Sequence, residues 1–261
     1  MKDESEKMER LDKILSKHGF GSRKDVHSLL AQKRVAVNGE ITRSGDMRLS
    51  LKSDRIEVDG EPILIQTHAY FMMNKAPGYV CSKKDGAQPS VFNLLSPEHT
   101  HTYLGGELSL IGRLDADTEG LLIFSTDGQL NHTLTSPKKK VPKVYLVRLR
   151  DSVSEADQKI YAQKLSEGIH IPADGKEAED DCLPAEIEWH EKKDDGTSDT
   201  CHLTLHEGKY HEVKRMFQAL ENEVIYLKRI SLGSLNLDEN LGLGEYRALT
   251  ESEVSKLKTE S

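Results

Sequence analysis

One short stretch of the chain concentrates side chains that can do chemistry. The glycine-bounded segment 112–120 carries three acids within five residues, Asp115, Asp117 and Glu119. An apolar run follows directly and predicts a buried strand that ends at an Asp-Gly turn signal. A carboxylate held beside a buried strand can serve as a general base, a nucleophile or a metal ligand. This loop is therefore the first candidate site.

Two interpretations of the loop involve no catalysis. Acids in a polar loop are most often only solvated. The spacing also matches the first positions of a calcium-binding loop, but that motif needs a bidentate acid at position 12, where this chain has Thr126. Because the flanking residues predict strand rather than helix, the sequence argues against calcium.

A third interpretation comes from the order of the residues. Arg113-Leu114-Asp115, then Asp117-Thr118 and then Gly120-Leu121-Leu122, resembles the active-site loop of the pseudouridine synthases. In that superfamily the aspartate of the Arg-Leu-Asp triplet is essential. The resemblance implies that Asp115 is catalytic and that Arg113 supports it. We expect Asp117 to be structural and to bond amides of the loop.

Two segments on either side of the loop continue the resemblance. Residues 70–82, with Asn74-Lys75-Ala76-Pro77-Gly78, resemble the first motif of the superfamily and predict a strand, a Pro-Gly turn and a second strand. Residues 143–149 alternate as a strand with Tyr145 on an apolar face. An aromatic residue in a strand usually belongs to the core. The Lys-x-Tyr pair, however, resembles the motif whose tyrosine packs beside the target base, which makes Tyr145 a site residue.

The segment 207–217 resembles the third active-site motif of the superfamily. Apolar residues from Val213 to Leu220 have helical spacing, so a turn at Glu207–Lys209 leads into an amphipathic helix. By periodicity alone, its two cations are only exposed charges. In the motif, a basic residue pairs with the catalytic aspartate, and Lys214 takes that place with Arg215 beside it. Either cation would favour the charged form of Asp115.

The N-terminal residues predict a small helical module. Two short helices, the second beginning with a capping box at Ser22–Asp25, precede a strand, an Asn38-Gly39 turn and a return strand. This order resembles the S4 domain, which binds structured RNA through basic helix faces. Any single surface cation is usually just solvated, but a cluster favours phosphate contact. The candidates are Arg10, Lys13, Arg23, Lys24 and Lys33.

The distribution of charge is uneven along the chain. The formal charge is −8, but residues 8–52 hold ten Lys/Arg against five Asp/Glu, whereas residues 151–200 hold five against fifteen. A basic module beside an acidic segment is compatible with RNA binding on one face. Three cysteines without zinc spacing predict no metal site and favour a reducing compartment. With a charged N-terminus and no long apolar run, we expect a cytoplasmic protein without membrane association.

The predicted architecture is α+β with two domains. We expect a disordered lead-in at 1–7 and an S4 RNA-binding domain of helices plus a short hairpin at 8–66. The remaining residues, 67–261, are expected to form a pseudouridine synthase domain with a long mixed, mainly antiparallel sheet flanked by helices. The resemblance extends over residues 8–254.

The predicted function is isomerisation of one uridine of small-subunit (16S) rRNA to pseudouridine. The resemblance implies no cofactor and no metal. We expect a monomer whose partner is that rRNA, free or in a part-assembled ribosomal particle. One alternative is a synthase acting on large-subunit (23S) rRNA, because the motifs overlap. Another is a non-catalytic RNA-binding or ribosome-assembly protein, which would not need Asp115, Tyr145 and Lys214 together.

Overall fold

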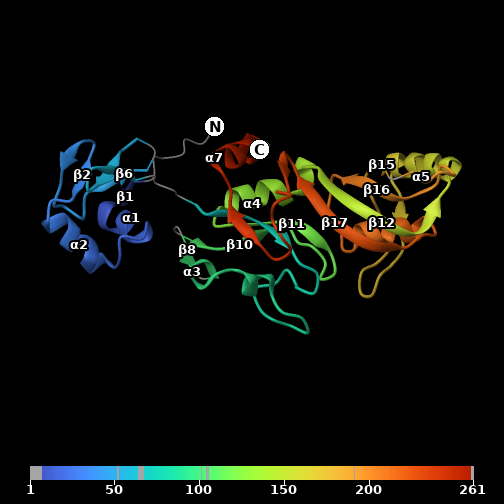
Figure 1. Ribbon diagram of the computed structural model, residues 1–261, viewed down its shortest axis with the longest axis horizontal. Coiled ribbons are helices and arrows are strands. Elements are labelled where there is room, and N and C mark those ends of the chain that lie inside the picture. Colours follow the sequence, from blue (N-terminus) through green and yellow to red (C-terminus); the bar gives the residue numbers. More distant parts are fainter. Residues whose placement is uncertain are drawn as a thin grey trace. The chain divides into compact units, whose positions relative to one another are not determined.

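The computed structural model divides into two compact units (Figure 1). The units are Met1–Ala69 with His101–Leu108, and Tyr70–Thr100 with Ser109–Ser261. The lead-in expected at 1–7 and the boundary expected at 66/67 lie outside the described residues. The structure describes residues 8–51, 53–63, 68–100, 102–103, 106–190 and 192–259.

The first unit combines two helices with short strands. Strand β1 pairs with β4, β8 pairs with β9, and a four-stranded sheet has the order β3-β2-β5-β6. The helices are α1 (Leu11–Lys17) and α2 (Arg23–Ala31). The strands are β1 (Met8–Arg10), β2 (Val35–Val37), β3 (Glu40–Ile41), β4 (Arg48–Ser50), β5 (Ile56–Val58), β6 (Glu61–Ile63), β8 (Thr102–Tyr103) and β9 (Gly106–Glu107).

Local sequence signals account for these elements. The Ser22 hydroxyl accepts a hydrogen bond from the Asp25 amide, and the Asp25 carboxylate accepts one from the Ser22 amide at 2.8 Å, so the predicted capping box begins α2. Asn38 and Gly39 both have positive φ, as a tight turn between β2 and β3 requires. Aliphatic side chains from both helices and from the strands form one core, and burying each contributes about 1.5–3 kcal/mol.

The second unit is built on a nine-stranded sheet. Its order is β15-β16-β12-β17-β11-β7-β19, with β10 paired to β11 and β18 to β17. Strands β11 and β17 are parallel and the other pairs are antiparallel, which confirms the predicted mixed sheet and α+β class. The strands are β7 (Tyr70–Lys75), β10 (Ser109–Ile111), β11 (Glu119–Ser125), β12 (Lys143–Val153), β15 (Glu186–His190), β16 (Ser198–Leu205), β17 (Val224–Leu232), β18 (Leu235–Asn236) and β19 (Tyr246–Ala248).

Helices of the second unit complete its cores. The apolar face of α6 (Glu212–Ala219) packs in the same core as the inward residues of β12, which include Tyr145 and Val147. The short strands β13 (His170–Ile171) and β14 (Asp180–Asp181) pair with each other. In the part of the chain that the structure describes, no helix has the length and apolarity needed to cross a membrane. The helices are α3 (Pro97–Thr100), α4 (Gly128–Thr135), α5 (Glu155–Glu167), α6 (Glu212–Ala219) and α7 (Glu251–Thr259), with 3-10 turns η1 (Val91–Leu94) and η2 (Pro137–Lys139).

The strand predicted after the Pro77-Gly78 turn does not form. Val80 makes only an isolated bridge with Ser90, and the next residues bend away. The amide of Gly78 instead donates to the carbonyl of Ala116 at 2.8 Å. This turn is therefore tied to the loop 112–120 and does not return beside β7.

The Asp127-Gly128 pair was predicted to form a tight turn, but it begins a helix instead. Asp127 is the N-cap of α4, and its carboxylate accepts hydrogen bonds from the amides of Gln129 and Leu130, each at 3.1 Å. The same dipeptide types that make a hairpin turn also suit a helix start, because an aspartate can satisfy the first free amides.

Candidate active site

The loop 112–120 joins β10 to β11 and is held by the end of β7. Lys75 is fully buried, and its Nζ donates to the carbonyl oxygens of Ala116 at 3.1 Å and Thr118 at 2.8 Å. Burial lowers the pKa of Lys75, although nearby acidic groups oppose this. A buried ammonium needs such acceptors, since burying it unpaired is costly. The first motif thus fixes the backbone that carries Asp115.

Gly120 allows β17 to lie directly against this loop. It has a φ of +100°, and a Cβ there would collide with the backbone oxygen of Arg229. The two residues are register partners in the parallel pair of β11 and β17. Only glycine combines this backbone conformation with so close an approach. The glycine therefore brings the side chains of β17 next to the acidic loop.

Asp115 and Lys214 are at the centre of the site. Lys214 Nζ lies 3.2 Å from Asp115 Oδ2 and 2.7 Å from Asp117 Oδ1. Partial burial alone would lower the pKa of Lys214, but the hydrogen bond to Asp117 and the charge of Asp115 outweigh it and raise that pKa. The Asp115 side chain is 25% exposed, against 71% for Asp117. Lys214 is thus a cation shared by one sheltered and one solvated carboxylate.

His211 is a third group beside Asp115. Its Nε2 lies 3.8 Å from Asp115 Oδ1, while its Nδ1 lies 2.7 Å from Asp174 Oδ2. The residue is the N-cap of α6 and has a left-handed backbone with a φ of 47°, and the ring of Tyr210 stacks on it. Such strained residues cost about 1–3 kcal/mol and concentrate at functional sites.

Tyr145 and Arg229 form the inner wall. Tyr145 is buried on β12, and burial raises the pKa of its phenol, whereas the nearby Arg229 guanidinium opposes the rise. Arg229 is 1% exposed, and its Nε donates to the carbonyl of Leu121 at 2.8 Å. Its Nη2 is buried and makes no hydrogen bond to any described residue. An unsatisfied buried donor is unfavourable, so a bound acceptor atom would relieve it.

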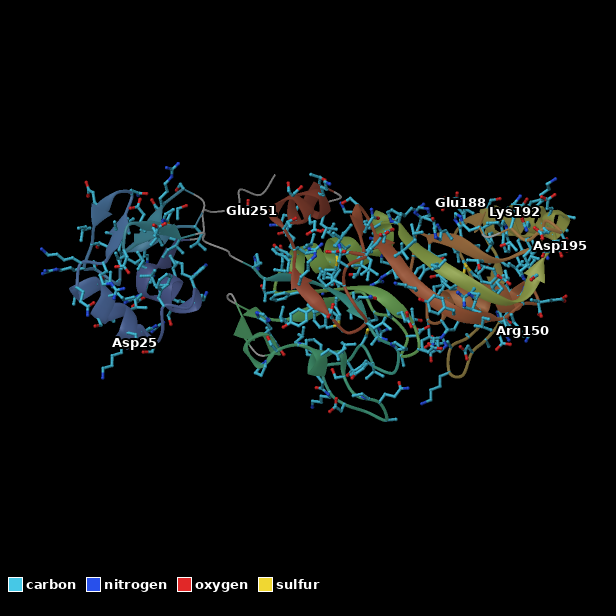
Figure 2. All side chains as sticks on the ribbon, viewed as in Figure 1. Asp25, Arg150, Glu188, Lys192, Asp195 and Glu251 are labelled. Carbon is cyan, nitrogen blue, oxygen red and sulfur yellow. The ribbon has the colours of Figure 1, made fainter. Side chains whose placement is uncertain are left out.

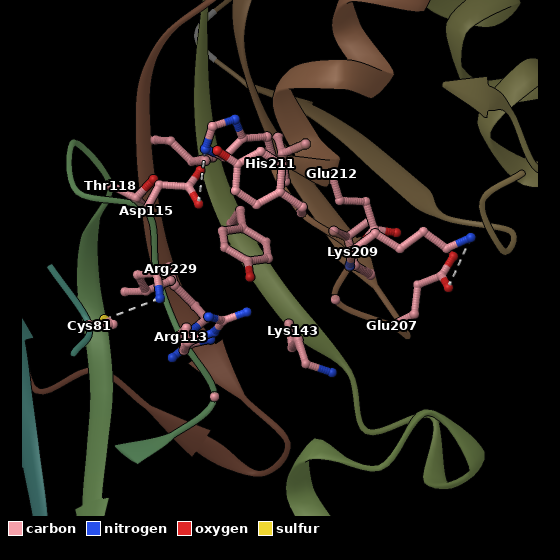
Figure 3. A pocket seen from close by; sticks show the side chains of 18 of the residues that line it. Cys81, Arg113, Asp115, Thr118, Lys143, Glu207, Lys209, His211, Glu212 and Arg229 are labelled. Atoms are coloured by element: carbon pink, nitrogen blue, oxygen red, sulfur yellow. Dashed lines mark hydrogen bonds and ion pairs between the residues drawn. The ribbon is translucent and has the colours of Figure 1, made fainter. Parts of the chain in front are cut away.

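Asp115, His211, Tyr145 and Arg229 line a cavity of about 700 Å³ in the second unit (Figure 3). Asp115, Thr118 and His211 lie at one end of the view, and Glu207 and Lys209 lie across from them (Figure 3). The volume is in the range that takes one small ligand or nucleotide. The cavity therefore presents a sheltered carboxylate, several cations and an aromatic ring to one bound group.

Two acids of the cavity lining, Glu207 and Glu212, belong to a cluster that could hold a cation. With Cys182, which does not line the cavity, they bring one ligand atom each within 4.8 Å of one another. Burial raises the pKa of Glu212 to about 7, and the neighbouring Glu207 adds to the rise. Lys209 Nζ lies 3.7 Å from Glu207 Oε2, so an ammonium already occupies part of this negative environment.

Two predicted supporting residues have contacts other than those expected. Arg215 is buried and donates to the carbonyls of Pro172, Tyr210 and Ala178, so it does not pair with Asp115. Consecutive helix residues point in different directions, and only Lys214 faces the loop.

Asp117 was expected to bond amides of the loop, but both of its oxygens are bound by Lys214, at 2.7 and 2.9 Å. Arg113, the third supporting residue, lines the cavity, is exposed, and forms no ion pair with another described residue.

The five candidate RNA-binding cations of the first unit fall into two groups. Arg10 Nη2 lies 2.8 Å from Asp12 Oδ2, and Lys13 Nζ lies 2.7 Å from Glu9 Oε1, so these two are already paired. The others are exposed and form no ion pair within the described residues. They are Arg23, Lys24 and Lys33.

Sequence reasoning did not identify two of the groups at the site. The sequence did contain an indication for Arg229. This charged residue alternates with Leu227 on the inward face of a strand, where an apolar residue is expected. His211 had none, because its position depends on a left-handed backbone and on Asp174, which lies 37 residues away.

Comparison with known proteins places this geometry in a family. A model described as RNA pseudouridylate synthase matches residues 69–219, and one for the S4 domain matches residues 9–56. The chain is 40% identical to an uncharacterized RNA pseudouridine synthase of Bacillus subtilis, over 95% of this chain and 98% of that protein. It is 39% identical to ribosomal small subunit pseudouridine synthase A of Haemophilus influenzae, over 95% and 99%.

A solved structure described as a pseudouridylate synthase is also similar to this chain. It has a TM-score of 0.62 and 38% identity, covering 95% of this chain and 99% of its own. The chain therefore belongs to the RNA pseudouridine synthase family, with an S4 domain at its N-terminal side, and is an isomerase.

Proposed function

We propose that this chain converts one uridine of small-subunit (16S) rRNA to pseudouridine, with Asp115 as the catalytic residue. The observation that carries the proposal is the position of Asp115, which lines a cavity large enough for one nucleotide and lies 3.2 Å from Lys214 Nζ. Relatives named ribosomal small subunit pseudouridine synthase A, which match 95% of this chain, support the choice of substrate.

The reaction is an internal exchange of bonds. The C1′–N1 glycosidic bond breaks, the uracil turns, and a C1′–C5 bond forms, while the proton of C5 is lost and N1 gains one. Because the product is an isomer, no external reactant is consumed. Asp115 would act on the sugar as a nucleophile or as a base, and Lys214 supplies the matching positive charge.

The inner wall would retain and orient the detached base. The buried ring of Tyr145 offers an apolar surface and helps to exclude water from the intermediate. The unpaired Nη2 of Arg229 offers a donor to a carbonyl oxygen of uracil. These roles differ from that of Asp115, because neither group needs to form a bond to the sugar.

The first unit would bind phosphates of the folded RNA. Arg23, Lys24 and Lys33 are exposed and unpaired within the described chain, so their charge is available. The target uridine must leave its stack to enter the cavity, at a cost of a few kcal/mol. Binding along the RNA would offset this cost. We place the activity in the cytoplasm, in a monomer acting on free rRNA or a part-assembled particle.

A pseudouridine map of rRNA tests the proposal. Small- and large-subunit transcripts, with and without ribosomal proteins, are incubated with wild type, Asp115→Asn or Asp195→Asn. New pseudouridines are then read by carbodiimide labelling and primer extension. Asp195 is the matched control, because it is exposed in the loop before β16 and its change removes the same charge (Figure 2).

We expect one new stop in the small-subunit RNA with wild type and Asp195→Asn, and none with Asp115→Asn. Turnover by Asp115→Asn would remove that residue from the mechanism. A stop in the large-subunit RNA would keep the chemistry and replace the substrate. Tight RNA binding without a stop on any substrate would favour a binding protein.

A further inference from the structure

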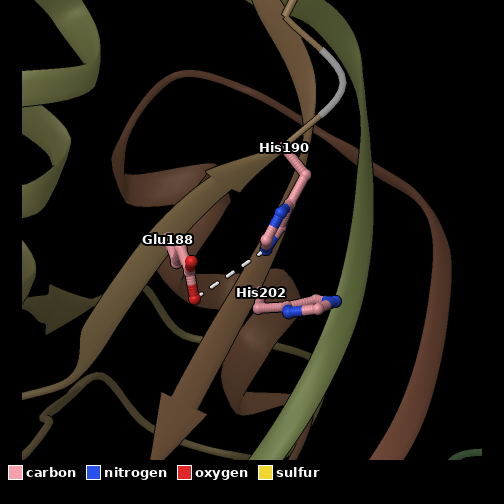
Figure 4. A group of neighbouring side chains, drawn as sticks. All are labelled: Glu188, His190 and His202. Carbon is pink, nitrogen blue, oxygen red and sulfur yellow. Dashed lines mark ion pairs between the residues drawn. The ribbon is translucent and has the colours of Figure 1, made fainter.

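A second group of convergent side chains lies on the β15–β16 hairpin (Figure 4), and none of its three residues lines the cavity. Glu188 and His190 are two residues apart on β15, so they project from the same face. Glu188 is the register partner of His202 on β16, which places His202 on that face too. Strand pairing thus brings one acid and two imidazoles together at an edge of the sheet.

The ligand atoms of the three side chains lie close together. One ligand atom from each lies within 4.8 Å of the other two. Glu188 Oε2 is 3.9 Å from His190 Nε2, and the two imidazole centroids are 4.1 Å apart. His190 Nε2 is buried and, within the described part of the chain, makes no hydrogen bond. A nitrogen enclosed in this way has its lone pair or its proton unsatisfied.

We propose that Glu188, His190 and His202 bind a divalent transition-metal ion, with zinc the expected occupant. Two imidazole nitrogens and one carboxylate oxygen are a donor set that zinc binds tetrahedrally, with water in the fourth position. Magnesium and calcium prefer oxygen ligands only, so they should not compete.

The fit requires only a small adjustment of the side chains. Zinc–ligand bonds of about 2.0–2.2 Å place tetrahedral ligand atoms roughly 3.3 Å apart. Because the three ligand atoms lie within 4.8 Å of one another, they must close by at most about 1.5 Å. The Glu188 side chain is 76% exposed and can rotate. The ion would join edge strand β15 to β16 and would stabilise the hairpin by binding only the folded state.

The same hairpin provides a matched control. His206 Nε2 lies 3.0 Å from Glu186 Oε2, which is also a pair of one imidazole and one carboxylate beside these strands. Among the described residues, no third metal-binding side chain converges on this pair. Two ligands hold an ion far less well than three, so removing His206 should leave zinc binding unchanged.

The test uses the full-length protein, freed of metal with a chelator and titrated with zinc chloride or magnesium chloride. Calorimetry and thermal melts are recorded for wild type, His190→Ala, His202→Ala, His206→Ala and Cys182→Ser. The last variant removes the sulfur of the cluster formed by Cys182, Glu207 and Glu212. We expect one zinc equivalent and a raised Tm in wild type, His206→Ala and Cys182→Ser, and no response to magnesium. Affinity should fall more than about tenfold in His190→Ala and in His202→Ala.

Three results would overturn the proposal. They are no binding at micromolar zinc, binding unchanged in both His190→Ala and His202→Ala, and binding lost in Cys182→Ser. A cobalt(II) spectrum of wild type tests the site without any substitution. Nitrogen and oxygen ligands give no sulfur-to-metal charge-transfer band, and the appearance of that band would also contradict the assignment.

Discussion

The helix pair of the first unit and the strands beside the acidic loop of the second unit carry their positive charges in opposite ways. In the first unit, Arg23 and Lys24 are exposed at the start of α2 and pair with no described residue. In the second, Lys75 and Arg229 are at most 1% exposed, and both donate to carbonyls of the segment 116–121.

The contrast separates two uses of a cation. An exposed cation can contact any phosphate and contributes little to stability. A buried cation must have partners from the protein, so it determines the positions of those partners. On this basis, the first unit would contribute affinity, whereas the buried cations of the second shape the site itself.

The largest effect is expected from removing a buried cation. Lys75→Met leaves the carbonyls of Ala76 and Thr118 without their donor, which should destabilise the second unit by about 2–5 kcal/mol. Urea unfolding followed by the fluorescence of Trp189, the single tryptophan, measures this unit. Lys159→Met, an exposed change on α5, should stay within about 0.5 kcal/mol. An equal loss of unfolding free energy in the two variants would contradict the distinction between buried and exposed cations.

A smaller effect on stability is expected from the titration of a buried acid, Glu212. Burial raises the pKa of Glu212 from its ordinary 4.5 to about 7. Since the folded state binds this proton more tightly, the stability contribution is complete below pH 4.5 and is lost as pH rises through 7. Between pH 5 and pH 8 the loss should be about 2 kcal/mol.

Glu212→Gln should remove this part of the pH dependence, so its Tm should fall less than that of wild type between pH 5 and pH 8. Glu179→Gln serves as the exposed control, with a side chain 72% exposed, and should follow wild type. An unchanged slope in Glu212→Gln would show that the carboxyl titrates in its ordinary range.

The smallest effect is expected from replacing exposed cations of the first unit, and it should change only the affinity for RNA. Replacing Arg23, Lys24 and Lys33 together by glutamine should weaken rRNA binding about tenfold at low salt and reduce the salt slope by about 2. Turnover at saturating RNA should not change. The paired cations Arg10 and Lys13, replaced in the same way, should cost less affinity, which filter binding across a salt series can measure.

The sequence predicted best what depends on neighbouring residues. The capping box of Ser22 and Asp25 and the Asn38-Gly39 turn act within a few residues, and both are present. The mixed sheet was implied by family resemblance, and it too is present. The proximity of Lys214 to Asp115 was implied in the same way, and the structure places them 3.2 Å apart.

What the sequence did not predict depends on distant contacts. The turn at Gly78 did not continue as a strand, because its amide bonds to Ala116 in another part of the chain. Arg215 faces the carbonyls of another loop, and its neighbour Lys214 faces the acids, a choice set by the rotation of α6. The types and spacing of residues do not determine which way such side chains face.

The parallel pairing of β11 with β17 has a consequence for the order of folding during synthesis. Arg229 donates to Leu121 across 108 residues of chain, and this long loop must close before the inner wall exists. The strand pairings among residues 8–63 of the first unit close shorter loops, the widest of which joins Met8 of β1 to Ser50 of β4, so they can form earlier as the chain leaves the ribosome. A newly made chain would therefore hold a folded N-terminal unit well before Asp115 acquires its surroundings.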